Sequence, residues 1–130
     1  MKINIAKPVL GDDEIEQVTR VIRSGMIASG PETLEFESEF AKFIGCKFAC
    51  AVNNGTSALS LSLSALGIGP GDEVITTPMT FVATANAILS CGAIPVFVDV
   101  DKDSFNLCPE STRKAISKKT KAVMPVHLYG

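Results

Sequence analysis

The chain has 130 residues, which is room for one hydrophobic core but not for a catalytic domain plus a separate substrate domain. Twelve basic and fourteen acidic side chains give a formal charge of -2, and 46% of the residues are hydrophobic, which excludes a disordered chain. The only dense basic stretch, residues 113–121, contains no aromatic side chain, so nucleic-acid binding is not expected either.

The cysteine pattern and the long uncharged stretches further limit the kinds of protein that the sequence can encode. The four cysteines have no C-x-x-C spacing and the single histidine is distant in sequence, so we expect no metal site and a reduced, cytoplasmic compartment. Residues 48–71 and 74–98 carry no charge, but Asn, Gly and Pro interrupt both runs, so neither predicts a membrane-spanning helix. Such runs are typical of buried parallel strands.

Two amphipathic helices are predicted near the N-terminus. Apolar residues recur at helical spacing over residues 12–23, with acids in the first turn and Gly25 as a stop signal. Residues 33–44 repeat the pattern before Gly45. The apolar stripe of this second helix consists of Phe36, Phe40, Phe43 and Ile44. We expect these side chains to lie in the core.

From residue 48 onward, short apolar strands alternate with helices. Strands are predicted at residues 48–52, 73–77, 94–98 and 122–127, and helices at 56–66, 81–91 and 109–117. This order predicts a three-layer α/β fold, with a mostly parallel sheet and helices on both faces. We divide the chain into an N-terminal helical segment, 1–47, and a β-α-β-α-β-α-β part, 48–130. Because no helix closes the last strand, we expect this part to be incomplete at its C-terminus.

The first candidate site lies where the strand 48–52 leads into the next helix. A helix N-terminus offers unsatisfied N–H groups and partial positive charge, which together seat a phosphate. Gly55 would let an anion approach the backbone, and Thr56 and Ser57 would add hydroxyl donors. The alternative is plain N-capping by Asn54 or Thr56. Position at the carboxyl end of a strand favours the phosphate, because open α/β sheets bind ligands there.

The second candidate is the segment 76–84, in which Pro78 ends a strand and Phe81 begins a helix. Phe81 is expected at the same rim as Gly55, that is, at the edge of the sheet where the carboxyl ends of the strands lie. An aromatic ring there could stack on a planar ligand, with Thr80 and Thr84 offering hydroxyls. The alternative is a phenylalanine of the core.

Two further polar features follow strands. Asp99 and Asp101 come after the third predicted strand and are expected to cap the loop toward Asn106 rather than bind a metal. His127 is expected to end the fourth strand, as a hydrogen-bonded rim residue or a general base.

Several motifs occur in a fixed order, among them Asn-Gly-Thr-Ser-Ala-Leu at 54–59, Gly-Ile-Gly-Pro-Gly-Asp-Glu-Val at 67–74, Thr-Phe-Val-Ala-Thr-Ala-Asn-Ala at 80–87 and Pro-Val-His-Leu-Tyr-Gly at 125–130. With them the chain resembles the DegT/StrS-type sugar aminotransferases, which are fold type I pyridoxal-phosphate enzymes. The resemblance implies that Gly55 and Thr56, with Ser57 adjacent, hold the cofactor phosphate. It also implies that Phe81 stacks on the pyridine ring, and that Ser29 and Gly30 lie near the sugar substrate.

The implied activity is amination of a keto-sugar nucleotide, with an amino acid such as glutamate as donor, by a full-length homodimer. In such enzymes the Schiff-base lysine and the aspartate that pairs with the pyridine nitrogen lie beyond the point matching Gly130. No catalytic residue is therefore assigned here, and we expect the chain alone to be inactive. Sugar dehydration on the same scaffold stays open. The residues alone also allow a non-catalytic module that binds a phosphorylated ligand or another subunit.

Overall fold

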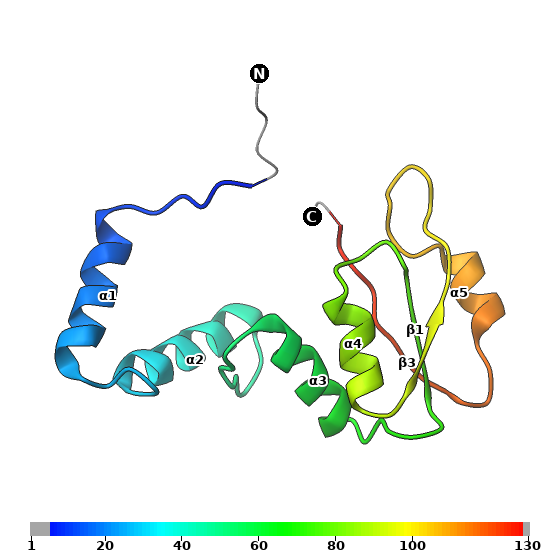
Figure 1. The fold of residues 1–130 in the computed structure, drawn as a ribbon, viewed down its shortest axis with the longest axis horizontal. Coiled ribbons are helices and arrows are strands. Elements are labelled where there is room, and N and C mark those ends of the chain that lie inside the picture. Colours follow the sequence, from blue (N-terminus) through cyan, green and yellow to red (C-terminus); the bar gives the residue numbers. More distant parts are fainter. Residues whose placement is uncertain (1–5, 129–130) are drawn as a thin grey trace. The chain divides into compact units, whose positions relative to one another are not determined.

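The computed structural model describes residues 6–128 and divides the chain into two compact units, residues 1–51 and 52–130 (Figure 1). The first unit holds α1 (Asp12–Ser24) and α2 (Pro31–Ile44). The second holds α3 (Gly55–Ala65), β1 (Glu73–Thr76), α4 (Ala83–Ser90), β2 (Ile94–Phe97), α5 (Pro109–Ala115) and β3 (Thr120–Val123). The division into a helical segment, 1–47, and a second part, 48–130, stays a prediction. None of the helices in the described residues has the length and apolar run needed to cross a bilayer.

The two helices of the first unit begin and end where the sequence signals lie. The Glu14 carboxylate accepts the Gly11 N–H at 2.6 Å, and this hydrogen bond lowers the pKa of Glu14. Gly25 and Gly45 end α1 and α2 in the left-handed region, with φ of 73° and 77°. Arg20 on α1 and Glu32 on α2 form an exposed ion pair at 2.7 Å. The predicted helices are therefore confirmed, although α2 begins two residues earlier than expected.

The expected burial of the α2 stripe is wrong in this structure. Phe36, Phe40 and Phe43 are 55%, 46% and 86% exposed, and Ile44 is exposed as well. Ala41 is the one buried residue of α2, and α1 has none. Burying an apolar stripe requires an opposing apolar surface, and the described residues of this unit offer only α1 for that purpose. Amphipathic spacing thus predicted the helix correctly but not its partner.

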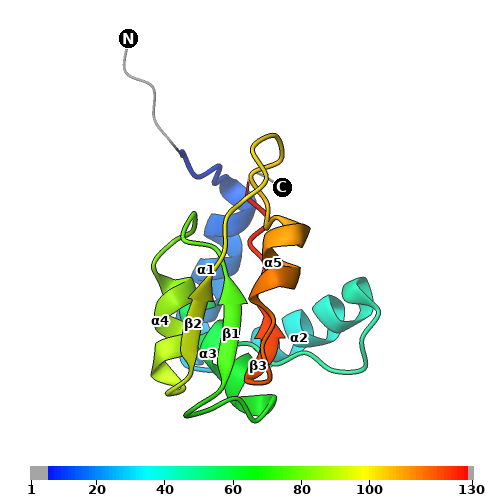
Figure 2. The same cartoon turned by 90° about the vertical axis from the view of Figure 1, so that its right-hand side faces the viewer.

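The sheet of the second unit is parallel, in the order β2-β1-β3. Figure 1 shows α4 on one side of the strands and α5 on the other, and Figure 2 shows β1 between its two neighbours. This confirms the predicted α/β class. Val74, Ile75 and Thr76 of β1 are fully buried, as expected for a central strand covered on both faces. Pro95 lies on β2, which pairs with β1 alone among the described strands, so its missing N–H costs no ladder bond there.

Two of the predicted strands differ from the structure. Residues 48–52 form no strand, because their backbone is not paired with a described strand; the Ala51 N–H instead donates to the Glu37 carboxylate at 2.7 Å. The last strand is β3 and not residues 122–127. Its pairing with β1 continues to the Met124 N–H, which donates to the Ile75 carbonyl at 2.8 Å. Pro125 follows and has no N–H to continue the ladder.

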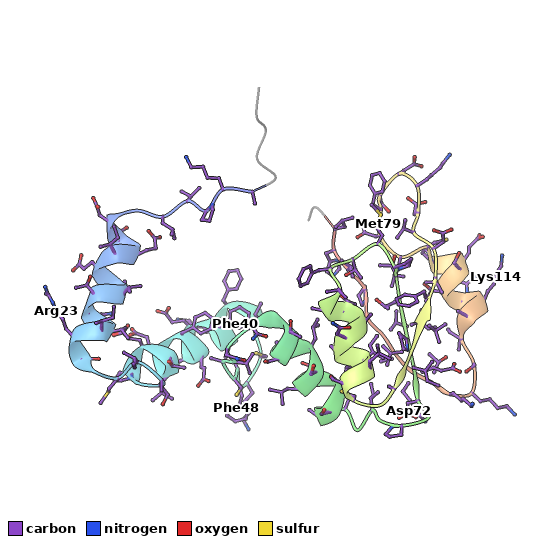
Figure 3. The ribbon with its side chains drawn as sticks, in the orientation of Figure 1. Arg23, Phe40, Phe48, Asp72, Met79 and Lys114 are labelled. Atoms are coloured by element: carbon purple, nitrogen blue, oxygen red, sulfur yellow. The ribbon has the colours of Figure 1, made fainter. Side chains whose placement is uncertain are left out.

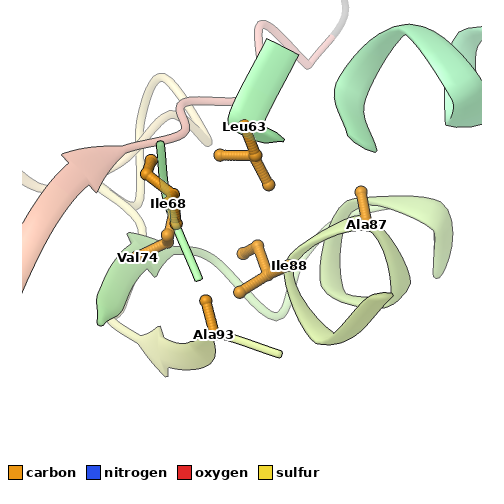
Figure 4. Close-up of a cluster of buried hydrophobic side chains, with 6 residues drawn as sticks. All are labelled: Leu63, Ile68, Val74, Ala87, Ile88 and Ala93. Atoms are coloured by element: carbon orange, nitrogen blue, oxygen red, sulfur yellow. The ribbon is translucent and has the colours of Figure 1, made fainter. Parts of the chain in front are cut away.

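The core of the second unit lies between the sheet and the helices α3 and α4 (Figure 4). The buried cluster consists of Leu63, Ile68, Val74, Ala87, Ile88 and Ala93. It joins α3, β1, α4 and the segments that lead into β1 and β2. These contacts fix the two helices against the sheet.

We expect Ile88→Ala to lower the free energy of unfolding by about 2–5 kcal/mol, because it removes a fully buried side chain and leaves a cavity. The neighbouring Leu89→Ala is the matched control, since Leu89 is 57% exposed, and it is expected to cost less than about 1 kcal/mol. Denaturant unfolding of both variants and the parent measures the difference. Equal losses for the two variants would contradict this description of the core.

Candidate functional site

The first turn of α3 begins with a capped N-terminus. Asn54 is extended, with φ of -167° and ψ of 169°, and its side-chain oxygen accepts the Ser57 N–H at 2.9 Å. The Asn54 carbonyl accepts the Ala58 N–H at 3.1 Å, which is the first hydrogen bond of the helix. The capping interpretation is therefore correct for Asn54. Capping satisfies one of the unpaired N–H groups and leaves the others.

The first turn of α3 carries further donors besides the one that Asn54 takes. Within the described residues, the N–H groups of Gly55 and Thr56 and the hydroxyls of Thr56 and Ser57 make no hydrogen bond. Gly55 and Thr56 are exposed, and Ser57 is half-buried. A Cβ built on Gly55 would meet no atom within 4 Å, and the first turn carries no acidic residue. Two N–H groups, two hydroxyls and the positive end of a helix fit a phosphate anion.

The connection from β1 to α4 presents Phe81, whose side chain is 76% exposed. The alternative that Phe81 belongs to the core is therefore wrong. Three hydrogen bonds shape the connection before and after it. The Thr77 hydroxyl accepts the Met79 N–H at 3.1 Å, the Pro78 carbonyl accepts the Thr80 N–H at 3.0 Å, and the Phe81 carbonyl accepts the Thr84 N–H at 3.1 Å. Figure 3 labels Met79 in this connection.

Packing between α3 and α4 links the two candidate segments. The Ser60 and Ser90 hydroxyl oxygens lie 3.1 Å apart, and the Ser64 hydroxyl oxygen lies 3.5 Å from the Cys91 sulfur. Figure 1 shows both helices running toward the same end of the unit, so their first turns lie toward the other end, where β1 finishes. The structure thus places Gly55 and Phe81 on elements that share one rim. Their roles toward a cofactor stay predictions.

Ser29 and Gly30 belong to the first unit, in the turn between α1 and α2. This turn contributes to a hollow of about 190 Å³ that Met26 and Pro31 also line. Gly30 precedes the first residue of α2, and a Cβ on it would lie 3.1 Å from the Met26 Cβ, so the tight approach favours glycine. Their role toward a sugar also stays a prediction.

The aspartates and the histidine lie in loops. The Asp101 side chain accepts the N–H groups of Ser104 at 2.9 Å and Asp103 at 3.1 Å, and these bonds lower the pKa of Asp101. Asp101 therefore caps its loop as expected. His127 is exposed and lies beyond β3, so the expectation that it ends a strand is wrong. The reason is Pro125, which stops the ladder.

Sequence reasoning included Thr77 in the second candidate segment but gave its side chain no role. Thr77 is 1% exposed, and its hydroxyl organises the start of the connection that carries Phe81. A usable signal was present: a buried strand that ends in two threonines followed by proline places a hydroxyl beside a free backbone N–H.

Comparison with known proteins identifies the family of the chain. The model described as the DegT/DnrJ/EryC1/StrS aminotransferase family matches residues 8–130. The chain belongs to this family. It is 51% identical over 123 residues to the spore coat polysaccharide biosynthesis protein SpsC of Bacillus subtilis. The aligned residues make up 95% of this chain and 32% of SpsC. It therefore spans about a third of the length of the curated relatives it matches.

Solved structures of aminotransferases have the same fold over this part of their chains. An aminotransferase from Psychrobacter cryohalolentis superimposes with a TM-score of 0.88 at 44% identity, over 95% of this chain and 32% of that one. The PLP-form of Spr1654 from Streptococcus pneumoniae gives a TM-score of 0.90 at 38% identity, over 98% of this chain and 33% of that one. Both confirm that the α/β arrangement described above is that of the aminotransferase family.

We expect Asn54→Ala to lower the free energy of unfolding by about 1 kcal/mol, because it removes the hydrogen bond to the Ser57 N–H. Asn53→Ala is the matched control: Asn53 is exposed and makes no hydrogen bond among the described residues, so its loss is expected within about 0.5 kcal/mol. Denaturant unfolding measures both. A loss at residue 53 as large as that at residue 54 would refute the assignment of the cap.

Proposed function

We propose that the full-length protein is a pyridoxal-phosphate-dependent aminotransferase that aminates a keto-sugar nucleotide, with an amino acid such as glutamate as donor. Membership of the aminotransferase family supports the reaction class. The PLP-form of Spr1654 and the structure of NtdA from Bacillus subtilis with bound PMP support the cofactor. The name of SpsC, a polysaccharide biosynthesis protein, supports a sugar substrate.

The observation that carries the proposal is the open first turn of α3. The N–H groups of Gly55 and Thr56 and the hydroxyls of Thr56 and Ser57 would bind the cofactor phosphate, while Asn54 keeps the turn ordered. Phe81 would stack its exposed ring on the pyridine ring. When bound, pyridoxal phosphate supplies the electron sink for moving an amino group. Ser29 and Gly30 are proposed to contact the sugar.

The cellular setting forms part of the same proposal. All four cysteines are free, which supports a reducing compartment, and we propose a cytoplasmic homodimer.

The proposal is tested with purified full-length protein, pyridoxal phosphate, glutamate and a panel of keto-sugar nucleotides. The expected result is an amino-sugar nucleotide and 2-oxoglutarate in equal amounts, together with a cofactor that borohydride attaches to a lysine, as detected by mass spectrometry. Cofactor binding with neither lysine attachment nor amino transfer would favour related chemistry such as sugar dehydration, because the residue at the lysine position distinguishes the two reactions. A protein that binds no cofactor would refute the proposal and favour the non-catalytic module.

We expect Thr56→Ala to raise the dissociation constant for pyridoxal phosphate about tenfold or more, because a hydroxyl donor to a charged phosphate is lost. Ser62→Ala is the matched control, since this exposed hydroxyl lies on the same helix and makes no hydrogen bond among the described residues. Absorbance titration of the cofactor-free protein measures both. If the two variants bind equally well, Thr56 does not contact the phosphate.

A further inference from the structure

We propose that the hydroxyl pair of Thr80 and Thr84 is a positioning device that holds the Phe81 backbone and thereby sets the ring against the cofactor. This inference rests on the proposed function. Thr80 and Thr84 are positioning residues, because they act through Phe81. The pair joins the end of the connection to the first turn of α4.

The pair itself is close and sheltered. The two hydroxyl oxygens lie 2.7 Å apart, the usual distance for an O–H···O hydrogen bond. Thr84 is 7% exposed in the first turn of α4, and Thr80 is half-buried in the preceding connection. Water therefore competes poorly for the Thr84 hydroxyl, so the bond is made between the two side chains rather than with solvent.

The Phe81 side chain has little packing of its own. It is 76% exposed, so side-chain burial does not fix its direction. Its backbone is held instead, since residues 80 and 84 are joined through their side chains and the Phe81 carbonyl accepts the Thr84 N–H at 3.1 Å. A short loop closed by two bonds leaves the Cα–Cβ direction of the enclosed residue little freedom.

The start of the connection is anchored separately by the sheet. The Thr76 hydroxyl donates to the Met124 carbonyl at 2.9 Å, and the buried Thr77 accepts the Met79 N–H at 3.1 Å. These bonds fix residues 76–79, and the Thr80 N–H donates to the Pro78 carbonyl at 3.0 Å, but none of these bonds reaches α4. The Thr80–Thr84 pair is therefore the side-chain link that connects the anchored start with α4.

Pre-organisation explains why a hydroxyl pair is useful here. Stacking depends on the offset and tilt of two rings, so a ring that samples many directions loses binding free energy when it is ordered. A pair of valines has nearly the shape of a pair of threonines but cannot make the bond. Replacing the threonines by valines therefore keeps the packing and removes the hydrogen bond. This change separates a positioning role of the pair from a contribution to stability alone.

The test compares the full-length parent with Thr80→Ser, Thr80→Val and the double variant Thr80→Val/Thr84→Val, and uses Thr19→Val on α1 as the control for the same chemical change. Hydrogen exchange of the cofactor-free protein is measured over residues 79–86 and over β1. We expect exchange at 79–86 to rise about tenfold in both valine variants, with β1 unchanged. Thr80→Ser keeps the hydroxyl and is expected to match the parent, as is Thr19→Val.

The second readout is cofactor binding. In the valine variants we expect the dissociation constant for pyridoxal phosphate to rise about tenfold and the circular dichroism of the bound cofactor to fall, with both restored in Thr80→Ser. Faster exchange at 79–86 with unchanged affinity and dichroism would overturn the positioning role, and so would unchanged exchange. A parent protein that binds no pyridoxal phosphate would overturn the proposed function instead, whereas a parent that binds it normally isolates a failure of this inference alone.

Discussion

The second unit depends on the double pairing of β1. This strand bonds to β2 on one side and β3 on the other, and Val74, Ile75 and Thr76 are fully buried. A shift of its register by one residue would move every one of these side chains to the opposite face of the sheet, where it would have to pack against the other layer. The register decides where β1 ends, and hence where the connection carrying Phe81 begins. The position of the candidate site residue Phe81 therefore depends on how this strand packs.

The helices then determine what the rim can bind. Leu63 of α3 and Ile88 of α4 meet in the core cluster, and Ser60 and Ser90 lie 3.1 Å apart at the side of it. Leu63, Ile88 and Ser90 lie beyond the first turns of their helices, and the Ser60 hydroxyl reaches the first turn of α3 only at the Thr56 carbonyl, at 3.1 Å. The first turn of α3 is thus positioned by packing elsewhere and keeps its own polar groups free for a ligand. Rigid support of this kind reduces the ordering cost of binding, since the donors are in place beforehand.

The sequence predicts this architecture well where local chemistry decides the outcome and poorly where a distant partner decides it. Glycine stop signals and periodic apolar residues located α1 and α2, because capping acts within a few residues. The apolar run 48–52 was wrongly predicted as a strand, since the Ala51 N–H pairs with Glu37, 14 residues earlier in the chain. The predicted burial of the α2 phenylalanines was wrong for the same reason, because apolar spacing defines one face of a helix but not the surface that covers it.

Capping and anion binding at α3 are compatible, although the sequence presents them as alternatives. The Asn54 side chain takes only the Ser57 N–H, which lies third in the helix, and its extended backbone starts the helix cleanly. The first two N–H groups, at Gly55 and Thr56, remain directed along the helix axis. The cap therefore orders the turn whose free donors would hold a phosphate. Loss of the cap would loosen that turn before any ligand arrives, so Asn54 would influence anion binding without contacting the anion.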